Sequence, residues 1–394
     1  MAMELLNNLK KSKLRRLYFA IITFLPILAF IVVTDFNIAG QYRGFFLLKG
    51  NNGSLFELKD DLYLGDGSRL IMALDLPLFH KRGKPQKRRP GEVYLSYDWD
   101  NKEGSGYVRS YMPDGAELLT CFSRFRDSSG KYAKGLIVGG GLPESVEVNS
   151  SVKLNDTGMA YYDGKKWDHV WCSSNEAISP GNGDRLLYPS SWEYLGGKVL
   201  NEGANSLVIM SSHRVMVGGV PLHMDRYAYF RAGEPYFILS IWIKNTGTRP
   251  AAYQYLYGDE PWVGDYGSSK GNVGWVKGRI IQYETQIDPS RYSYGGLFDY
   301  GNEAIGEPHI YTMTANFIEW IGENRPIRCY FSNQPGSVDP KVPLQSDERF
   351  IGLEWRMHEL APGQSDNIRL VIGMAAKDDH GFPALPKIDL EGVE

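Results

Sequence analysis

The segment 253–275 gathers residue types that can bind a sugar. It reads YQYLYGDEPWVGDYGSSKGNVGW, so Tyr and Trp rings are interspersed with carboxylates and glycines. Rigid aromatic rings supply contact area, carboxylates accept hydrogen bonds from sugar hydroxyls, and glycine lets the backbone approach a ligand closely. A second aromatic stretch, 291–300, is expected to line the same cleft. The predicted contact residues are Trp262, Trp275, Tyr266, Asp259, Glu260 and Tyr294.

Two other interpretations of this segment stay open. Asp259, Glu260 and Asp265 offer the hard oxygen ligands that Ca²⁺ prefers, although their spacing does not follow the EF-hand pattern. Alternatively, the aromatic rings pack beneath a long loop as a small hydrophobic cluster, and they then stabilise the fold without touching a ligand. The sequence indicates no other cofactor.

The elements that must position these residues are strands. After residue 41, short runs of alternating apolar and polar residues are separated by Gly, Asn, Asp and Pro, which predicts antiparallel strands and argues against βαβ units. Hairpins are expected at 157–167 and at 207–230, where Gly218 and Gly219 form the second turn. Three consecutive strands are predicted to form a meander: 220–230, 236–245 and 251–257. Further strands are predicted at 278–286, 310–321, 327–332, 350–360 and 368–375.

Four segments between residues 207 and 262 resemble the galactose-mutarotase-like supersandwich. They read SSHRVMVGGVPL, DRYAYFRAGEPYF, IWIKNTGTRP and YGDEPW, and the third contains an N-x-G-x-x-P junction between strands at 245–250. The superfamily includes sugar epimerases, polysaccharide-lyase domains and glycosidase β-domains. For the C-terminal half of this chain, the resemblance implies an all-β fold with a large antiparallel β-sandwich. It also implies a carbohydrate as ligand or substrate, although fold alone does not confer an activity.

Acid–base chemistry on a sugar would use other residues. Mutarotation and epimerisation need a general acid and a general base on opposite sides of the sugar ring, typically His with Glu. The candidates are His213, His223 and Glu260. The two histidines lie on consecutive strands of the second predicted hairpin, so we expect that they can face each other. A single His in a strand is more often structural, and whether the chain is an enzyme stays open.

The N-terminus has the pattern of a membrane anchor. Five cations lie between residues 10 and 16, and the uncharged run 17–34 follows. At about 1.5 Å per residue, a helix over this run is on the order of 27 Å long, enough to cross a hydrocarbon core. The basic flank is expected to stay cytoplasmic, which places the body in the periplasm or at the cell surface. The alternative is a cleaved signal peptide that ends at Ala39.

This pattern divides the chain into three parts. We predict a cytoplasmic tail over 1–16, a transmembrane signal-anchor over 17–34 and an extracytoplasmic β-sandwich over 41–394. The last part has possible halves at 41–200 and 201–394.

Cysteines and charge exclude some classes of function. Cys121, Cys172 and Cys329 form no Cys/His cluster, so a structural zinc site is not indicated. One pair could form a disulfide in an oxidising compartment, or all three are small buried residues. The net charge of −3 gives no reason to bind nucleic acid. The basic segment 81–89 is either a solvated loop or a contact for anionic lipid or an acidic polymer.

The sequence therefore favours a membrane-anchored β-sandwich that binds, or acts on, a carbohydrate outside the cytoplasm. The alternative is a structural or assembly subunit of a membrane-associated complex. In that case the aromatic loops would contact a protein partner, because Tyr and Trp also dominate protein interfaces.

Overall fold

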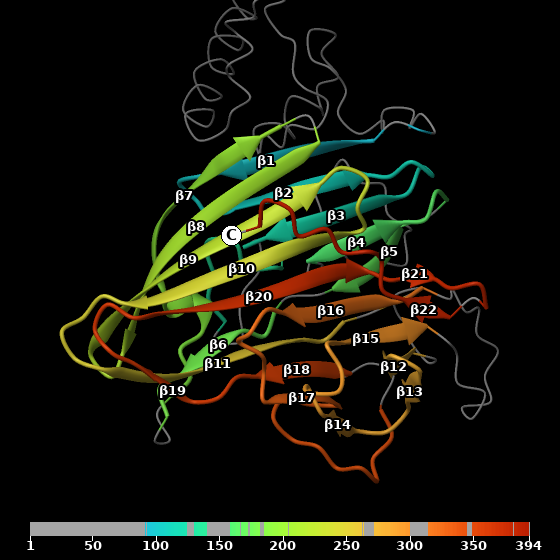
Figure 1. Ribbon diagram of the computed structural model, residues 1–394. Helices are drawn as coiled ribbons and strands as arrows, with labels where there is room; N and C mark the ends of the chain where they lie inside the picture. The colour runs from blue at the N-terminus through green and yellow to red at the C-terminus, as the bar shows by residue number, and fades with distance from the viewer. Residues whose placement is uncertain are drawn as a thin grey trace, which may run out of the picture. The chain divides into compact units, whose positions relative to one another are not determined.

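Strands make up nearly all of the regular structure in the computed structural model (Figure 1). The only helical element in the part that the structure describes is a single 3-10 turn, η3 (Pro189–Ser191). The predicted all-β fold is therefore confirmed. The described residues are 91–394 apart from 92, 124–129, 140–157, 166, 172–173, 182–184, 204, 262, 264–271, 300–313, 345–348, 381 and 394.

A five-stranded antiparallel sheet begins the described chain, and its strands follow in sequence order. The predicted hairpin at 157–167 is its last pair, in which Met159 lies opposite Trp171 and Tyr162 opposite Trp167. The strands are β1 (Tyr94–Asp100), β2 (Ser105–Tyr111), β3 (Glu117–Phe122), β4 (Met159–Tyr162) and β5 (Trp167–Trp171).

A nine-stranded antiparallel sheet has the order β13-β12-β15-β16-β20-β10-β9-β8-β7. The predicted hairpin at 207–230 lies within it, as β8 and β9 joined by Gly218 and Gly219, both of which have positive φ. The nine strands are β7 (Glu193–Glu202), β8 (Ser206–Val217), β9 (Val220–Arg231), β10 (Tyr236–Asn245), β12 (Asn272–Val276), β13 (Arg279–Ile281), β15 (Tyr294–Asp299), β16 (Asn316–Ile321) and β20 (Ser365–Met374).

A six-stranded sheet contains most of the remaining strands. Its path is β14-β17-β18-β11-β19, and the short strand β6 also pairs with β11. The strands are β6 (Ala177–Ser179), β11 (Ala251–Asp259), β14 (Thr285–Ile287), β17 (Arg328–Ser332), β18 (Phe350–Glu354) and β19 (His358–Leu360). Two short strands, β21 (Ala376–Lys377) and β22 (Pro383–Ala384), pair with each other.

The predicted meander over three strands is wrong at its last step. β10 pairs with β9 and β20, whereas β11 joins the six-stranded sheet. The side chain of Asn245, at the end of β10, is fully buried and donates to the carbonyls of Arg249 and Leu360, each at 2.8 Å. Its Oδ1 accepts the N–H of Gly247. These bonds fix the 245–250 turn, through which the chain passes from the nine-stranded sheet to the six-stranded sheet.

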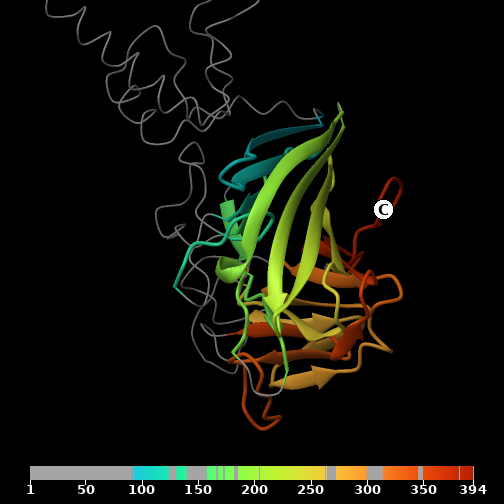
Figure 2. The same cartoon turned by 90° about the vertical axis from the view of Figure 1, so that its left-hand side faces the viewer.

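The main hydrophobic cluster joins all three large sheets. It includes Phe122 of β3, Phe237 of β10 and Tyr255 of β11, and the first two rings meet edge to face with centroids 5.8 Å apart. A second cluster covers the opposite face of the nine-stranded sheet, where Leu385 and Ile388 of the C-terminal segment pack. Figure 2 shows this segment, in red, on the side of the long strands away from β1–β3.

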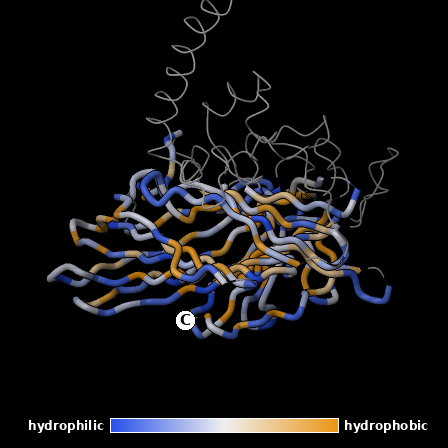
Figure 3. Tube along the Cα trace, turned by 90° about the horizontal axis from the view of Figure 1, so that it is seen from above, coloured by the Kyte–Doolittle hydropathy of each residue, from blue (hydrophilic) through white to orange (hydrophobic). Residues whose placement is uncertain are grey.

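Hydropathy follows the strand period. Buried and more exposed residues alternate along β8 and β9, and Figure 3 shows the corresponding alternation of colour along the strands. Val220, Leu222 and Met224 share the buried face of β9, and His223 and Asp225 lie on the other face. Each strand of the nine-stranded sheet therefore has an inner face, toward the main cluster, and an outer face.

Several predicted features fall outside the described residues. They include the cations of 10–16, the span 17–34, the basic segment 81–89, and Cys172. Among the residues that the structure does describe, no helix is long and apolar enough to cross a membrane. Cys121 and Cys329 are both buried. The described residues belong to one compact unit, and β7 includes both residue 200 and residue 201. The anchor and its orientation stay predictions.

Candidate functional site: a buried polar cluster and an aromatic outer face

Three polar side chains occupy inner-face positions of β8 and β9 that the strand period assigns to the core. They are Ser211, His213 and Arg226, and all three have an exposed fraction of 0%. Burying such groups costs free energy unless they are hydrogen-bonded or paired. Sequence reasoning proposed only His213. The signal for the others was present, because Ser211 and Arg226 interrupt an otherwise apolar series at every second residue.

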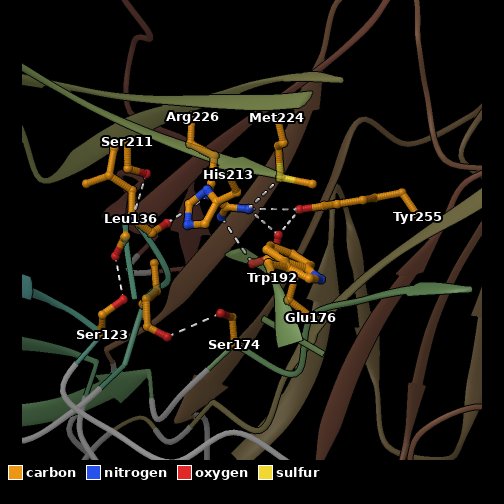
Figure 4. Close-up of polar contacts among 12 residues, drawn as sticks. Ser123, Leu136, Ser174, Glu176, Trp192, Ser211, His213, Met224, Arg226 and Tyr255 are labelled. Atoms are coloured by element: carbon orange, nitrogen blue, oxygen red, sulfur yellow. Dashed lines mark hydrogen bonds and ion pairs between the residues drawn. The ribbon is translucent and has the colours of Figure 1, made fainter. Parts of the chain in front are cut away.

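Arg226 forms a buried ion pair with Glu176, the residue just before β6 (Figure 4). The pair is bidentate: Nη1 donates to Oε1, and Nη2 donates to Oε2 at 3.1 Å. The hydroxyl of Tyr255 donates to the same carboxylate, and Arg226 Nε donates to the carbonyl of Leu136 at 3.1 Å. Burial raises the pKa of Glu176, and the charge of Arg226 opposes that shift. One arginine thus connects the nine-stranded sheet to the six-stranded sheet and to the 133–138 segment.

His213 is held as a neutral imidazole. Its Nε2 lies 2.9 Å from the carbonyl oxygen of Lys134, and because a carbonyl only accepts, Nε2 must carry the hydrogen. Nδ1 is buried and has no hydrogen-bond partner among the described residues. Burial, with a further contribution from the charge of Arg226, lowers the pKa of His213 to about 3. The ring packs against Trp192 and Tyr194.

Tyrosines of β11 complete the inner surface of this cluster. Tyr253, Tyr255 and Tyr257 are all at most 3% exposed and lie at every second position of the strand. Tyr253 donates to Asp366 at 2.7 Å, and burial raises the pKa of Tyr257. Figure 4 shows Tyr255 hydrogen-bonded to Glu176 and Arg226 within the cluster. The cluster holds the sheets together. Its potential acid and base groups are buried and therefore do not face an open site.

The two candidate catalytic histidines do not face each other. β8 and β9 pair His213 with Met224 and Arg214 with His223. Because successive side chains point to opposite faces of a strand, His213 lies on the inner face and His223 on the outer face. The expectation that they converge is therefore wrong, and the reason is a register offset by one residue. Glu260 is half-buried just past the end of β11, where its backbone N–H donates to Asp259.

The outer face around His223 carries a polar and aromatic surface. Asp225 accepts hydrogen bonds from Ser212 Oγ at 2.5 Å and from His223 Nε2 at 3.0 Å. Trp242 lies directly across from Asp225 on β10 and is 37% exposed. Tyr227, the next outward residue on β9, stacks with the following one, Tyr229, with ring centroids 6.3 Å apart. Tyr229 is half-buried, and it packs against the rim of the second hydrophobic cluster. We call Tyr229, Tyr227 and Trp242 the aromatic strip.

A pocket of about 380 Å³ opens at the Tyr229 end of the aromatic strip. Its walls come from β7, β8, β9 and β10 and from the C-terminal segment 389–393. Arg231 pairs with Asp389, and the backbone N–H of Asp389 donates to the hydroxyl of Tyr236 at 2.9 Å, so the C-terminal wall is fixed. The other polar groups that line the pocket include Asn201, Asn205, Ser206 and Glu391.

The ligand-contact residues predicted in and near segment 253–275 do not form one exposed surface among the described residues. Trp275 is 1% exposed, donates its indole N–H to the carbonyl of Asn316 at 2.9 Å and packs on Tyr294 at 5.0 Å between centroids. Both rings belong to the second hydrophobic cluster, so in this structure they present little surface to a ligand. Asp259 is buried, at 1% exposed. Trp262, Asp265 and Tyr266 lie outside the described residues, and so their predicted roles stay predictions.

The described residues contain no group of His, Cys, Asp and Glu that could hold a metal ion. Asp265 lies outside these residues, and the Ca²⁺ site stays a prediction.

Comparison with known proteins gives a likeness of fold. No family model matches the chain, and no curated protein matches it. Among solved structures, an aldose 1-epimerase candidate from Klebsiella pneumoniae is 12% identical, with 72% of this chain and 84% of that chain covered and a TM-score of 0.43. A galactose mutarotase-like protein from Clostridium acetobutylicum is 8% identical, with 72% and 98% covered and a TM-score of 0.38.

The chain resembles galactose mutarotase-like proteins. A third structure of this kind, from Lactobacillus casei, is 8% identical, with 71% and 99% of the two chains covered and a TM-score of 0.34. The sequence motifs resemble the same group of proteins. At such identities it says nothing about which residues of this chain bind a ligand.

His213 predicts a pH dependence of stability. Its pKa is near 6.5 in the unfolded chain and about 3 in the folded protein. Between these values the unfolded state binds the extra proton, so His213 should destabilise the fold progressively as the pH falls from 6.5 toward 3. The His213→Gln variant keeps a donor for Lys134 but does not titrate. Denaturant unfolding at pH 7 and pH 4 should show the wild type losing on the order of a few kcal/mol more than the variant. Equal losses would contradict a buried neutral His213.

Proposed function

We propose that the body of this protein binds a carbohydrate without transforming it, and that the aromatic strip on the outer face of the nine-stranded sheet is the binding surface. The strip is the observation that carries the proposal. Tyr229, Tyr227 and Trp242 occupy three consecutive outward rows of the sheet. At about 3.3 Å per residue along a strand, three such rows span roughly 13 Å, enough for more than one sugar ring.

The chemistry around the strip suits sugar hydroxyls. Asp225 lies beside Trp242 with one oxygen already bonded to His223 and Ser212. On the other side of the strip, Arg369 Nε donates to Asn367 Oδ1 at 2.6 Å, and Asn367 Nδ2 donates to Ser240 at 3.0 Å. Rings therefore alternate with oriented donors and acceptors, which is the combination that a sugar with apolar C–H faces and polar edges requires.

The pocket at the Tyr229 end would receive the end of the carbohydrate. Its volume of about 380 Å³ falls within the range of small-molecule sites. Asn201 and Asn205 line the pocket together with Tyr229, and Asn201 Nδ2 donates to Ser206 Oγ at 3.3 Å. We infer that a chain-like glycan lies along the strip and ends in this pocket.

Binding is favoured over catalysis by where the acid and base groups lie. His213, Glu176 and Arg226 are each at most 1% exposed; Glu176 and Arg226 pair with each other, and His213 Nε2 donates to the Lys134 carbonyl. His223 is on the opposite face of the sheet and pairs with Asp225 instead. Within the described residues, no acid and base of the predicted set lie on opposite sides of an open site. We further propose that segment 17–34 anchors this body to a membrane, with the body outside the cytoplasm.

The strip makes a quantitative prediction. The full-length protein should bind glycans on an array, and Trp242→Ala and Tyr227→Ala should each weaken that binding roughly tenfold. One ring contributes about 0.5–1.5 kcal/mol, and about 1.4 kcal/mol is a factor of ten. Tyr132→Ala is the matched control, because it removes a ring that is 64% exposed but is not part of the strip. Equal affinities for all three variants and the wild type would refute the assignment.

An assembly subunit remains the second candidate because of a specific apolar edge. Leu195 and Leu200, at the two bulges of the edge strand β7, are 40% and 46% exposed, and Met216 of β8 is 52% exposed. Three exposed aliphatic side chains near one sheet edge favour a protein contact. A partner protein that is lost on Leu200→Ser and kept on Trp242→Ala would favour this candidate.

A further inference from the structure

A second pocket, of about 650 Å³, lies between the edge strands of two sheets. It is formed by β13 of the nine-stranded sheet, β14 and Arg328 of the six-stranded sheet, and Val338 and Pro340 of the 333–344 loop. Its volume is within the range of ligand sites. It shares no lining residue with the pocket at the aromatic strip.

The one carboxylate among its lining residues is already used. Glu284 is 5% exposed and accepts the backbone N–H groups of Asn333 at 2.9 Å and Asp339 at 2.7 Å, one on each oxygen. These bonds fix the 333–339 part of the loop against β14. Both oxygens of the Glu284 carboxylate are therefore bonded to the loop that forms the pocket wall, and neither is left to bind a ligand.

The two arginines that line the pocket differ in what they already bind. Arg328 donates to Glu354 at 2.8 Å, to Gln286 at 3.2 Å and to the carbonyl of Gly336, and its guanidinium lies 4.3 Å from the centre of the Tyr330 ring. Its charge is balanced by Glu354. Arg279 is exposed, and within the described part of the chain nothing pairs with its guanidinium. Arg279 is therefore the uncompensated positive charge of this pocket.

The pocket that contains Arg279 also has two exposed neutral side chains, Tyr283 and Gln282. Tyr283 is 51% exposed and is one of the residues that line the pocket. The Gln282 amide is also exposed and has no partner among the described side chains. A guanidinium that can form two parallel bonds, an aromatic ring and an amide together match a sugar that carries an anionic group.

We infer that this pocket binds an acidic saccharide, with the carboxylate or sulfate group on Arg279 and the sugar ring on Tyr283. The inference rests on the proposed carbohydrate function and adds a charge preference and a second site to it. A glycan held at both sites would gain avidity if it is long enough to reach them. A neutral glycan would use the aromatic strip alone.

The test uses the full-length protein and three probes: an oligogalacturonate of defined length, its carboxyl-reduced neutral counterpart, and inorganic sulfate. Titration calorimetry should give Arg279→Ala about tenfold weaker binding of the oligogalacturonate, with unchanged binding of the reduced sugar. Arg279→Lys should be intermediate, because the charge remains while the paired geometry is lost. Binding of sulfate alone, with no preference for the acidic sugar, would show an anion site and overturn the saccharide assignment.

Two control variants separate the failure of this inference from that of the proposed function. Arg356→Ala removes another exposed arginine that has no partner among the described residues, and it should leave every titration unchanged. If Arg279→Ala equals the wild type while Trp242→Ala weakens both sugars, the pocket inference is overturned and the aromatic strip stands. If neither variant changes either titration, both are overturned.

Discussion

Arg226→Met should lower the free energy of unfolding by about 3–5 kcal/mol, because it leaves the Glu176 carboxylate buried without its cation. The variant also removes the donor to the Leu136 carbonyl, which is buried in the same cluster. Chemical denaturation of the full-length protein, followed by near-ultraviolet circular dichroism, measures the loss. Since the cluster joins two sheets, we expect unfolding to become less cooperative as well.

The matched control is Arg214→Met on the neighbouring strand. Arg214 pairs with Glu193 at 2.9 Å, but both side chains are about half exposed, so the loss should not exceed about 1 kcal/mol. The double variant Arg226→Met with Glu176→Gln should recover part of the loss, because no buried charge is then left unpaired and Tyr255 keeps an acceptor. If Arg226→Met and Arg214→Met cost the same, the buried cluster does not hold the sheets together.

Trp275→Ala should cost about 3–5 kcal/mol of stability, the range for truncation of a buried aromatic residue. The ring is 1% exposed, packs on Tyr294, and donates to the Asn316 carbonyl. Trp275→Phe should cost less, because it keeps most of the volume and loses only the indole N–H and part of the ring. Thermal unfolding monitored by circular dichroism gives both values.

The control for Trp275 is Trp242→Ala, which removes an indole that is 37% exposed on the same sheet. We expect that variant to unfold within a few degrees of the wild type and to lose glycan affinity. The reverse pattern, with Trp275→Ala stable but deficient in binding, would restore the ligand role that the sequence first indicated for Trp275.

Local structure was predictable where apolar residues recur regularly at every second position. The β8–β9 hairpin follows from apolar residues at every second position and from two adjacent glycines that adopt positive φ in its turn. The sandwich class followed from the number of such segments and from the absence of helical periodicity.

Features that depend on long-range pairing were not predictable. Whether β11 continues the meander depends on bonds from Asn245 to Leu360, more than a hundred residues away in sequence. The facing of His213 and His223 depended on a one-residue register offset across the hairpin. Trp275 was assigned to a ligand surface from composition, but its burial follows from β12 pairing with β15, which brings it against Tyr294.

The central claim is that the aromatic strip contacts a glycan, and hydroxyl-radical footprinting tests it most directly. The full-length protein is oxidised briefly with and without the tightest glycan from the array, and oxidation of each residue is measured by mass spectrometry. The proposal predicts that Tyr227, Tyr229 and Trp242 become protected, while Tyr132, which is 64% exposed and outside the strip, does not change. Protection that leaves these three residues unchanged and falls elsewhere would contradict it.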